Sequence, residues 1–103
     1  MFFFKSNSAE KANLKEEIAG NEGIVVDVRT AGEMAAGKVP GSIGADWFSG
    51  EFVKKAATWD PNKHYYLYCR SGGRSSAACG YLRSKGFNNV TDLGAYSSIA
   101  HLF

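Results

Sequence analysis

Two runs of apolar residues are the clearest feature of the sequence. Residues 24–28 (Ile-Val-Val-Asp-Val) and residues 65–69 (Tyr-Tyr-Leu-Tyr-Cys) are apolar at nearly every position. A short apolar run without alternation is typical of a strand buried on both faces, which is the usual condition in a parallel sheet. We therefore predict two central strands, with weaker strands at residues 42–45 and 89–93 and an edge strand at residues 2–4.

The segments between these runs have helical patterns. Helices are predicted over residues 9–19, 31–36, 46–58, 74–85 and 95–102. Ser8 is a suitable N-cap for the first helix, and Thr30 and Glu33 have the spacing of a capping box at the second. Strands that alternate with helices predict an α/β fold, with a mainly parallel central sheet flanked by helices on both faces.

Length and composition fit one globular domain, residues 1–103. Hydrophobic residues make up 45% of the chain and charged residues 21%, which argues against wholesale disorder. The net charge of +2, from 12 Lys and Arg against 10 Asp and Glu, is too balanced to argue for binding to nucleic acid. The longest apolar runs are a few residues, so insertion into a membrane is not expected either.

The sequence contains two cysteines, Cys69 and Cys79. Small secreted domains that depend on disulfides usually carry more, and a bridge between these two would close only a short loop. We therefore expect free thiols, as in a reducing compartment. Residues 1–5 lack the features of a signal peptide, so the expected location is cytoplasmic, or periplasmic if a leader has been removed.

The position of Cys69 indicates chemistry. It ends the best central strand, and ligands of open parallel sheets bind at the carboxyl ends of strands. The glycines of the following loop, residues 70–75, let backbone N–H groups turn inward as an anion-binding nest, and the next helix adds its positive N-terminus. With the charges of Arg70 and Arg74, these groups predict a lowered pKa for the Cys69 thiol.

Each cysteine has an alternative interpretation. Cys69 could be a small buried packing residue, as free cysteines often are, but a Gly-Gly loop between two arginines favours a nucleophile. Cys79 lies within a predicted helix, where packing is the expected role. The alternative for Cys79 is a thiol that resolves an oxidised Cys69.

The position of Arg74 separates two kinds of cysteine chemistry. Protein tyrosine phosphatases and related arsenate reductases place five residues between the cysteine and the arginine, whereas Arg74 comes one residue early. A tighter loop should not enclose a tetrahedral oxyanion well. It could instead seat a single extra sulfur atom on Cys69.

Three stretches resemble motifs of one family. Residues 25–30 (Val-Val-Asp-Val-Arg-Thr) are similar to a hydrophobic-Asp-Val-Arg motif, and residues 37–43 (Gly-Lys-Val-Pro-Gly-Ser-Ile) to a Gly-His-Ile-Pro-Gly-Ala segment. Residues 68–75 contain a six-residue active loop, which is the most specific of the three. The chain thus resembles a single-domain rhodanese, a thiosulfate or polysulfide sulfurtransferase. Residues 92–100 resemble the short, phage-shock-protein-like branch of this family.

The resemblance implies a small rhodanese-like domain that needs neither a metal nor an organic cofactor. Cys69 would be the catalytic residue. The loop would bind the substrate anion through Arg70, Ser71, Gly72, Gly73, Arg74 and Ser75. Asp27 and Arg29 would support the loop, with Asp27 paired to Arg74; a solvated strand end is the alternative. Ser71 would either donate its hydroxyl to the sulfur or only shape the turn.

The expected reaction is a double displacement. The Cys69 thiolate takes the outer sulfur of a small anionic donor such as thiosulfate or a polysulfide and keeps it as a persulfide. An acceptor, either cyanide or a thiol that includes protein thiols, then removes it. Two alternatives stay open: a rhodanese-like sulfur carrier or interaction module without turnover, and a cysteine-dependent phosphatase or arsenate reductase. Because the chain has no room for a lid, Cys69 is expected in a shallow, exposed loop.

Two positions depart from the family pattern. Lys38 replaces a histidine that is usually peripheral to catalysis. Ala95 replaces the second glycine of a Gly-Gly-aromatic turn, which would cost about 1 kcal/mol if that position needs a positive φ. His64 and His101 are expected away from the loop, and no spacing of His, Cys or carboxylates suggests a metal site. Three aromatic residues are expected in the core or at its rim: Trp47, Phe48 and Trp59.

Overall fold

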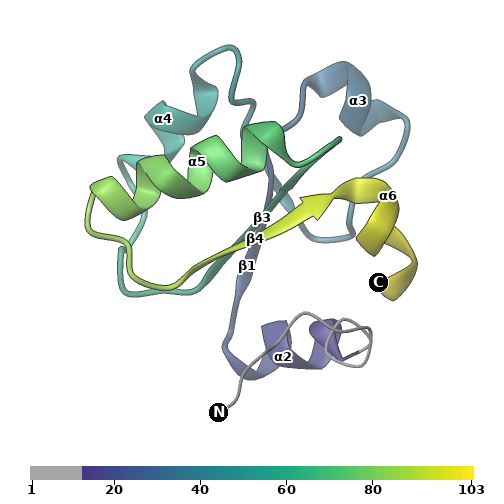
Figure 1. The fold of residues 1–103 in the computed structure, drawn as a ribbon, viewed down its shortest axis with the longest axis horizontal. Coiled ribbons are helices and arrows are strands. Elements are labelled where there is room, and N and C mark those ends of the chain that lie inside the picture. Colours follow the sequence, from purple (N-terminus) through teal and green to yellow (C-terminus); the bar gives the residue numbers. More distant parts are fainter. Residues whose placement is uncertain (1–12) are drawn as a thin grey trace.

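The computed structural model describes residues 13–103, which contain a central sheet of four parallel strands (Figure 1). The strands are β1 (Ile24–Asp27), β2 (Ile43–Gly44), β3 (Tyr65–Cys69) and β4 (Val90–Ala95), in the order β2-β1-β3-β4. Every neighbouring pair is parallel, which confirms the predicted α/β class. The strand predicted at residues 2–4 and the N-cap at Ser8 lie outside the described residues.

The two apolar runs form the two central strands. β3 has its predicted range, and all of its residues are buried. β1 ends at Asp27, one residue earlier than predicted, although the Val28 N–H still donates to the Tyr68 carbonyl at 3.0 Å. The weaker strands differ more: β2 covers only part of its predicted range, and β4 continues to Ala95.

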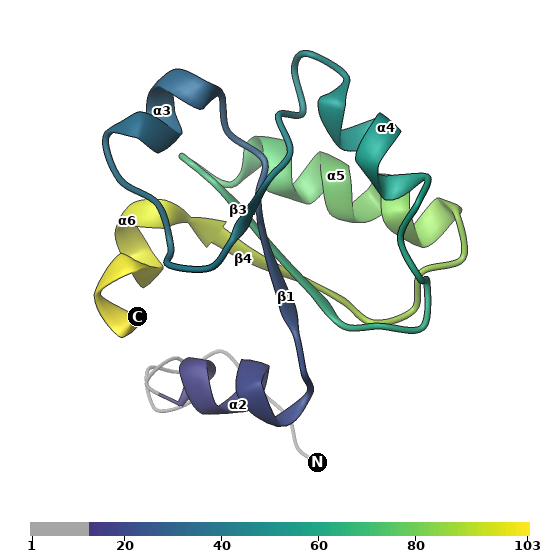
Figure 2. The same cartoon turned by 180° about the vertical axis from the view of Figure 1, so that it is seen from behind.

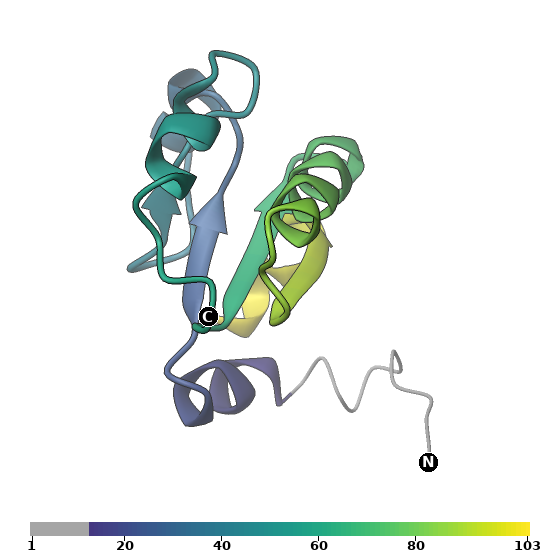
Figure 3. The same cartoon turned by 90° about the vertical axis from the view of Figure 1, so that its left-hand side faces the viewer.

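Helices cover both faces of the sheet, as predicted (Figures 1 and 2). They are α2 (Leu14–Gly20), α3 (Ala31–Ala35), α4 (Glu51–Ala56), α5 (Gly73–Ser84) and α6 (Tyr96–Ile99), followed by the 3-10 helix η1 (Ala100–Leu102). α4 and α5 bury Phe52 and Leu82 against Leu67, whereas α2 and α6 bury Ile18 and Ile99 on the other face. Figure 3 shows α4 beside β1 and α5 along β3 and β4.

The start of α3 follows the predicted capping box. The Thr30 hydroxyl accepts a hydrogen bond from the Glu33 N–H at 3.2 Å, and the Thr30 N–H donates to Glu33 Oε1 at 2.9 Å. The Glu33 side chain is therefore held at the first turn of α3, on the side of the molecule where β1 and β3 end. No helix within residues 13–103 is long and apolar enough to cross a membrane.

The helix predicted from residue 46 begins only at Glu51. The Asp46 carboxylate accepts a hydrogen bond from the Phe48 N–H at 2.9 Å, and Gly50 has a φ of 85°, so the chain turns before the helix starts. This turn leaves the Phe48 side chain outside the core, 71% exposed, which corrects the prediction for this residue. Trp47 and Trp59 pack at the rim of the core, as predicted.

Candidate active site at Cys69

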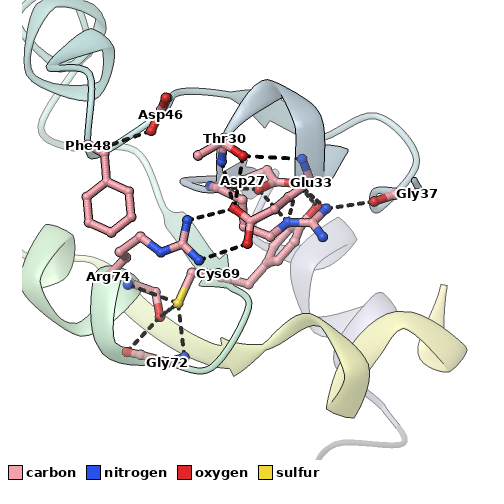
Figure 4. Close-up of polar contacts among 12 residues, drawn as sticks. Asp27, Thr30, Glu33, Gly37, Asp46, Phe48, Cys69, Gly72 and Arg74 are labelled. Atoms are coloured by element: carbon pink, nitrogen blue, oxygen red, sulfur yellow. Dashed lines mark hydrogen bonds and ion pairs between the residues drawn. The ribbon is translucent and has the colours of Figure 1, made fainter. Parts of the chain in front are cut away.

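Cys69 is the last residue of β3, and the loop that follows folds around its sulfur (Figure 4). Gly72 has a φ of 105°, a conformation that favours glycine, and it directs its N–H to the sulfur at 3.0 Å. The Ser75 N–H, in the first turn of α5, points to the same sulfur at 3.4 Å. The loop and the start of α5 thus form the predicted nest of N–H donors.

The Cys69 side chain is fully buried, with 0% of its surface exposed. The loop itself is exposed at Arg70, Ser71 and Gly73, as expected, but the expected exposure of Cys69 is wrong. β3 is an interior strand, and the loop returns over its end instead of extending into solvent, so strand, loop and α5 enclose the sulfur. A donor can reach the sulfur only after part of this enclosure moves.

The pKa of the Cys69 thiol is lowered, as predicted. Burial alone would raise it and is the largest single influence. The hydrogen bond between the sulfur and the Ser75 hydroxyl, together with hydrogen bonds from the N–H groups of Ser75, Gly72 and Ser71, outweighs burial. The shift therefore comes from short-range donors of the loop. The hydroxyl beside the sulfur, at 3.5 Å, belongs to Ser75, whereas Ser71 contributes its backbone N–H.

Asp92 is a member of the site that sequence reasoning missed. Its Oδ1 accepts hydrogen bonds from the Ser75 hydroxyl at 2.7 Å and from the Gly94 N–H at 2.9 Å. The carboxylate thereby fixes the Ser75 side chain beside the Cys69 sulfur. Nothing in the local sequence indicates this role, because it depends on β4 lying next to β3.

Arg74 pairs with Glu33, which corrects the predicted pairing with Asp27. Arg74 Nη1 and Nη2 donate to the two Glu33 carboxylate oxygens at 2.7 and 3.0 Å. These hydrogen bonds, followed by one from the Thr30 N–H, lower the pKa of Glu33 to about 2. The guanidinium also lies over the Phe48 ring, 4.8 Å from its centre. Much of the Arg74 charge predicted to act on Cys69 is therefore neutralised by Glu33.

Asp27 is instead paired with Arg29, two residues along the chain. Asp27 Oδ1 accepts from the Arg29 N–H and Nε, both at 2.9 Å, and Oδ2 accepts from Arg29 Nη2 at 2.7 Å and from the Tyr68 hydroxyl at 2.6 Å. Arg29 Nη2 also donates to the Gly37 carbonyl at 2.7 Å, and the guanidinium lies 4.3 Å from the centre of the Tyr96 ring. Asp27 and Arg29, at the end of β1, thus contact three other segments: β3, the turn that follows α3, and α6.

The turn at residues 94–96 carries no strain at Ala95. Gly94 has a φ of +80°, whereas Ala95 has a φ of −87° in the extended region. The predicted loss of about 1 kcal/mol applied only if Ala95 needed a positive φ. It does not, because the positive φ is at Gly94, which the chain retains.

A cleft of about 490 Å³ lies beside the active loop. Arg70 from the loop, Glu33 from α3 and Tyr96 from α6 contribute to its lining. His64 precedes β3 and is thus at the opposite end of that strand from Cys69, and His101 lies in η1. Within residues 13–103, no three His, Cys, Asp or Glu side chains are grouped to bind a metal ion.

Cys79 differs from Cys69 in its surroundings. It is buried in α5 within the hydrophobic core, and both thiols are free. Burial, followed by the nearby charge of Asp92, raises the pKa of Cys79 to about 12. This environment supports the predicted packing role.

The two cysteines are expected to react at different pH. As pH rises, the rate of alkylation of Cys69 by iodoacetamide should reach its midpoint at a lower pH than that of an ordinary thiol, because the loop lowers the pKa of Cys69. Cys79 should stay unreacted across this range. Peptide mass spectrometry after timed alkylation measures both. Equal midpoints for the two thiols would contradict the assignment.

A family profile and several known proteins match this chain. A family profile described as "Rhodanese-like domain" matches residues 10–100. The chain is 39% identical over 80 residues to the Bacillus subtilis (strain 168) protein named "Putative sulfurtransferase YtwF". The aligned residues cover 77% of this chain and 76% of that protein. It is 30% identical over 88 residues to an Allochromatium vinosum protein named "Sulfurtransferase", over 84% of this chain and 80% of that one.

The fold is shared as well. The crystal structure of a rhodanese-related protein from Thermoplasma volcanium superposes with a TM-score of 0.74 at 29% identity, over 88% of this chain and 87% of that one. The resemblance of residues 92–100 to the phage-shock-protein-like branch stays a prediction. From the profile match and these relatives, the chain belongs to the rhodanese-like domain family of sulfurtransferases.

Proposed function

We propose that this protein transfers sulfane sulfur from thiosulfate or a polysulfide to cyanide or a thiol, through a persulfide on Cys69. The observation that carries the proposal is the nest around Cys69, where the N–H groups of Gly72 and Ser75 lie 3.0 and 3.4 Å from the sulfur. A nest of this kind stabilises a thiolate before the reaction, and it can stabilise a negatively charged outer sulfur afterwards.

The first displacement loads the enzyme. The Cys69 thiolate attacks the outer sulfur of thiosulfate, and a sulfur–sulfur bond to Cys69 forms. The bond inside the donor breaks, and sulfite leaves with its electron pair. Cys69 then carries one additional sulfur, whose negative charge the donors of the loop stabilise.

The second displacement unloads it. Cyanide or an acceptor thiolate attacks the outer sulfur of the persulfide, and the Cys69 thiolate leaves with the bonding electrons. Thiocyanate or an acceptor persulfide is the product. The enzyme returns to its starting state, so neither half-reaction needs an external oxidant or reductant.

The cleft beside the loop is a suitable binding site for the proposed sulfur donor or acceptor. Arg70 is exposed and contributes to this cleft, so an anionic donor or an acidic acceptor would meet a positive charge close to Cys69. Free thiols at Cys69 and Cys79 fit a reducing compartment, so we propose a cytoplasmic location.

The direct test is the mass of the Cys69 peptide after incubation with thiosulfate or polysulfide. We expect one added sulfur on this peptide, and cyanide should remove it as thiocyanate. The peptide that contains Cys79 is the internal control and should gain none. A Cys69 peptide that gains no sulfur from any donor would overturn the proposal. Sulfur that loads but is not released to small acceptors would indicate a carrier instead.

Hydrolysis of an aryl phosphate tests the phosphatase alternative. The loop provides only four residues between Cys69 and Arg74, and the guanidinium of Arg74 faces Glu33. A tetrahedral phosphate would therefore find neither the loop length nor the free arginine that this chemistry uses. We expect no turnover of the aryl phosphate.

A further inference from the structure

Arg74 extends from the first turn of α5, next to the loop that encloses Cys69, toward Glu33 of α3. In Figure 4 the guanidinium lies between the sulfur and the Glu33 carboxylate. The pKa of Arg74 is raised mainly by its hydrogen bonds to Glu33, and the negative charge of a Cys69 thiolate contributes to the same shift. Because Cys69 is fully buried, a donor needs part of the surrounding structure to move, and Arg74 at the start of α5 is a side chain that could do so.

Glu33 holds the Arg74 guanidinium through both of its oxygens. Two parallel N–H···O hydrogen bonds, at 2.7 and 3.0 Å, occupy the Nη1–Nη2 edge, which is one of the edges that a bidentate anion could use. The side chains of Arg74 and Glu33 are 14% and 24% exposed, so solvent screens the pair only in part. The exposed side chain of Phe48, from the turn before α4, packs against the Arg74 guanidinium.

We infer that the Arg74–Glu33 pair is a releasable cover over Cys69, and that Glu33 competes with an anionic reactant for the Arg74 guanidinium. Glu33 is thus a positioning residue that sets the preference of the site for the charge of its reactants. The effect of the cover on sulfur transfer rests on the proposed function. The cover itself can be tested without a sulfur donor.

The variant Glu33→Gln removes the charge of the Glu33 side chain while it keeps the capping box of α3. Glutamine can replace glutamate in a capping box, so its side-chain oxygen can still accept from the Thr30 N–H and keep the start of α3. The variant loses the negative charge that retains Arg74. Glu17→Gln is the matched control, because Glu17 also lies in the first turn of a short helix, α2, and accepts a hydrogen bond, from the Tyr66 hydroxyl at 3.1 Å, that glutamine can also accept.

The test compares two alkylating reagents that react at the same carbon but differ in charge, iodoacetate and iodoacetamide. In Glu33→Gln we expect the ratio of the Cys69 alkylation rates, iodoacetate over iodoacetamide, to rise about fivefold over the wild type, which corresponds to about 1 kcal/mol. Glu17→Gln should leave the ratio unchanged. A ratio that does not change in Glu33→Gln overturns the competition between Glu33 and an anionic reactant, even if both rates rise because the cover opens.

A second measurement connects the cover to sulfur transfer. The rate at which thiosulfate loads Cys69 should rise in Glu33→Gln by a similar factor, because thiosulfate is also an anion. If the alkylation ratio rises but no variant gains sulfur, the proposed function fails while the cover stands. If the wild type gains sulfur and the alkylation ratio is unchanged, the competition fails while the proposed function stands.

Discussion

Replacing Cys69 by serine is expected to reduce thiosulfate:cyanide sulfurtransferase activity by at least about 10³-fold, to the level of the uncatalysed reaction. The hydroxyl that replaces the thiol stays protonated at neutral pH, and it cannot hold the transferred sulfur as a persulfide. The N–H groups of Gly72 and Ser75 would remain in place, but no nucleophile would lie between them. Thiocyanate formation at saturating thiosulfate and cyanide measures the loss.

Cys79→Ser is the matched control for this experiment. Cys79 lies in the core, and the pKa of its thiol is raised to about 12, so it supplies no thiolate at neutral pH. We expect this variant to keep its activity per folded molecule, with a modest loss of stability from the buried hydroxyl. Full activity in Cys69→Ser, or equal loss in both variants, would contradict the role assigned to Cys69.

Replacing Asp27 by alanine is expected to lower the free energy of unfolding by about 3–5 kcal/mol. Arg29 is only 5% exposed, and without Asp27 its charge would be buried without a carboxylate partner. The Tyr68 hydroxyl would also lose its acceptor. Small domains are stable by about 5–15 kcal/mol, so this variant would be close to unfolding at room temperature. Urea denaturation followed by far-UV circular dichroism measures the change.

Glu51→Ala calibrates this result. Glu51 and Lys55 form an ion pair between side chains that are 46% and 42% exposed, and such surface pairs usually contribute less than about 1 kcal/mol. A difference between the two variants of at least about 2 kcal/mol is expected from burial alone. If Asp27→Ala costs no more than Glu51→Ala, the ion pair of Asp27 and Arg29 is not the support that the geometry indicates.

Local patterns predicted the central part of the fold. The apolar run at residues 65–69 gave the range of β3, and the capping box at Thr30 gave the start of α3, because both signals lie within a few residues of chain. The start of α4 was wrong, because the turn at Asp46 and the positive φ of Gly50 outweigh the helical spacing of the aromatic residues. Element boundaries depend on such local competition.

The candidate site was predictable only where it is local. The Cys69 loop, with its glycines and arginines, is continuous in sequence, and its effect on the pKa of Cys69 has the predicted direction. The contact of Asp92 with Ser75 depends on strand order, so no local signal shows it. The partner of Arg74 also depends on tertiary structure, since Glu33 is supplied by another helix.

The pairing of Asp27 with Arg29 could have been found. Residues two apart in an extended segment place their side chains on the same side, so an Asp and an Arg at this spacing are natural partners. The prediction of an Asp27–Arg74 pair passed over this nearer cation. A simple rule follows for similar motifs: the nearest opposite charge on the same side of the strand should be tested before a distant one.

The alternation of side chains along β3 has a consequence for repeated turnover. Cys69 packs with the cluster under α4 and α5, whereas its neighbour Tyr68, which contacts Asp27, packs with the cluster on the opposite side of the sheet. Crowding caused by an added sulfur would therefore fall on one layer, and the layer anchored by Asp27 and Arg29 would be spared. A persulfide on Cys69, as proposed, would thus disturb the packing on one side of the sheet more than on the other.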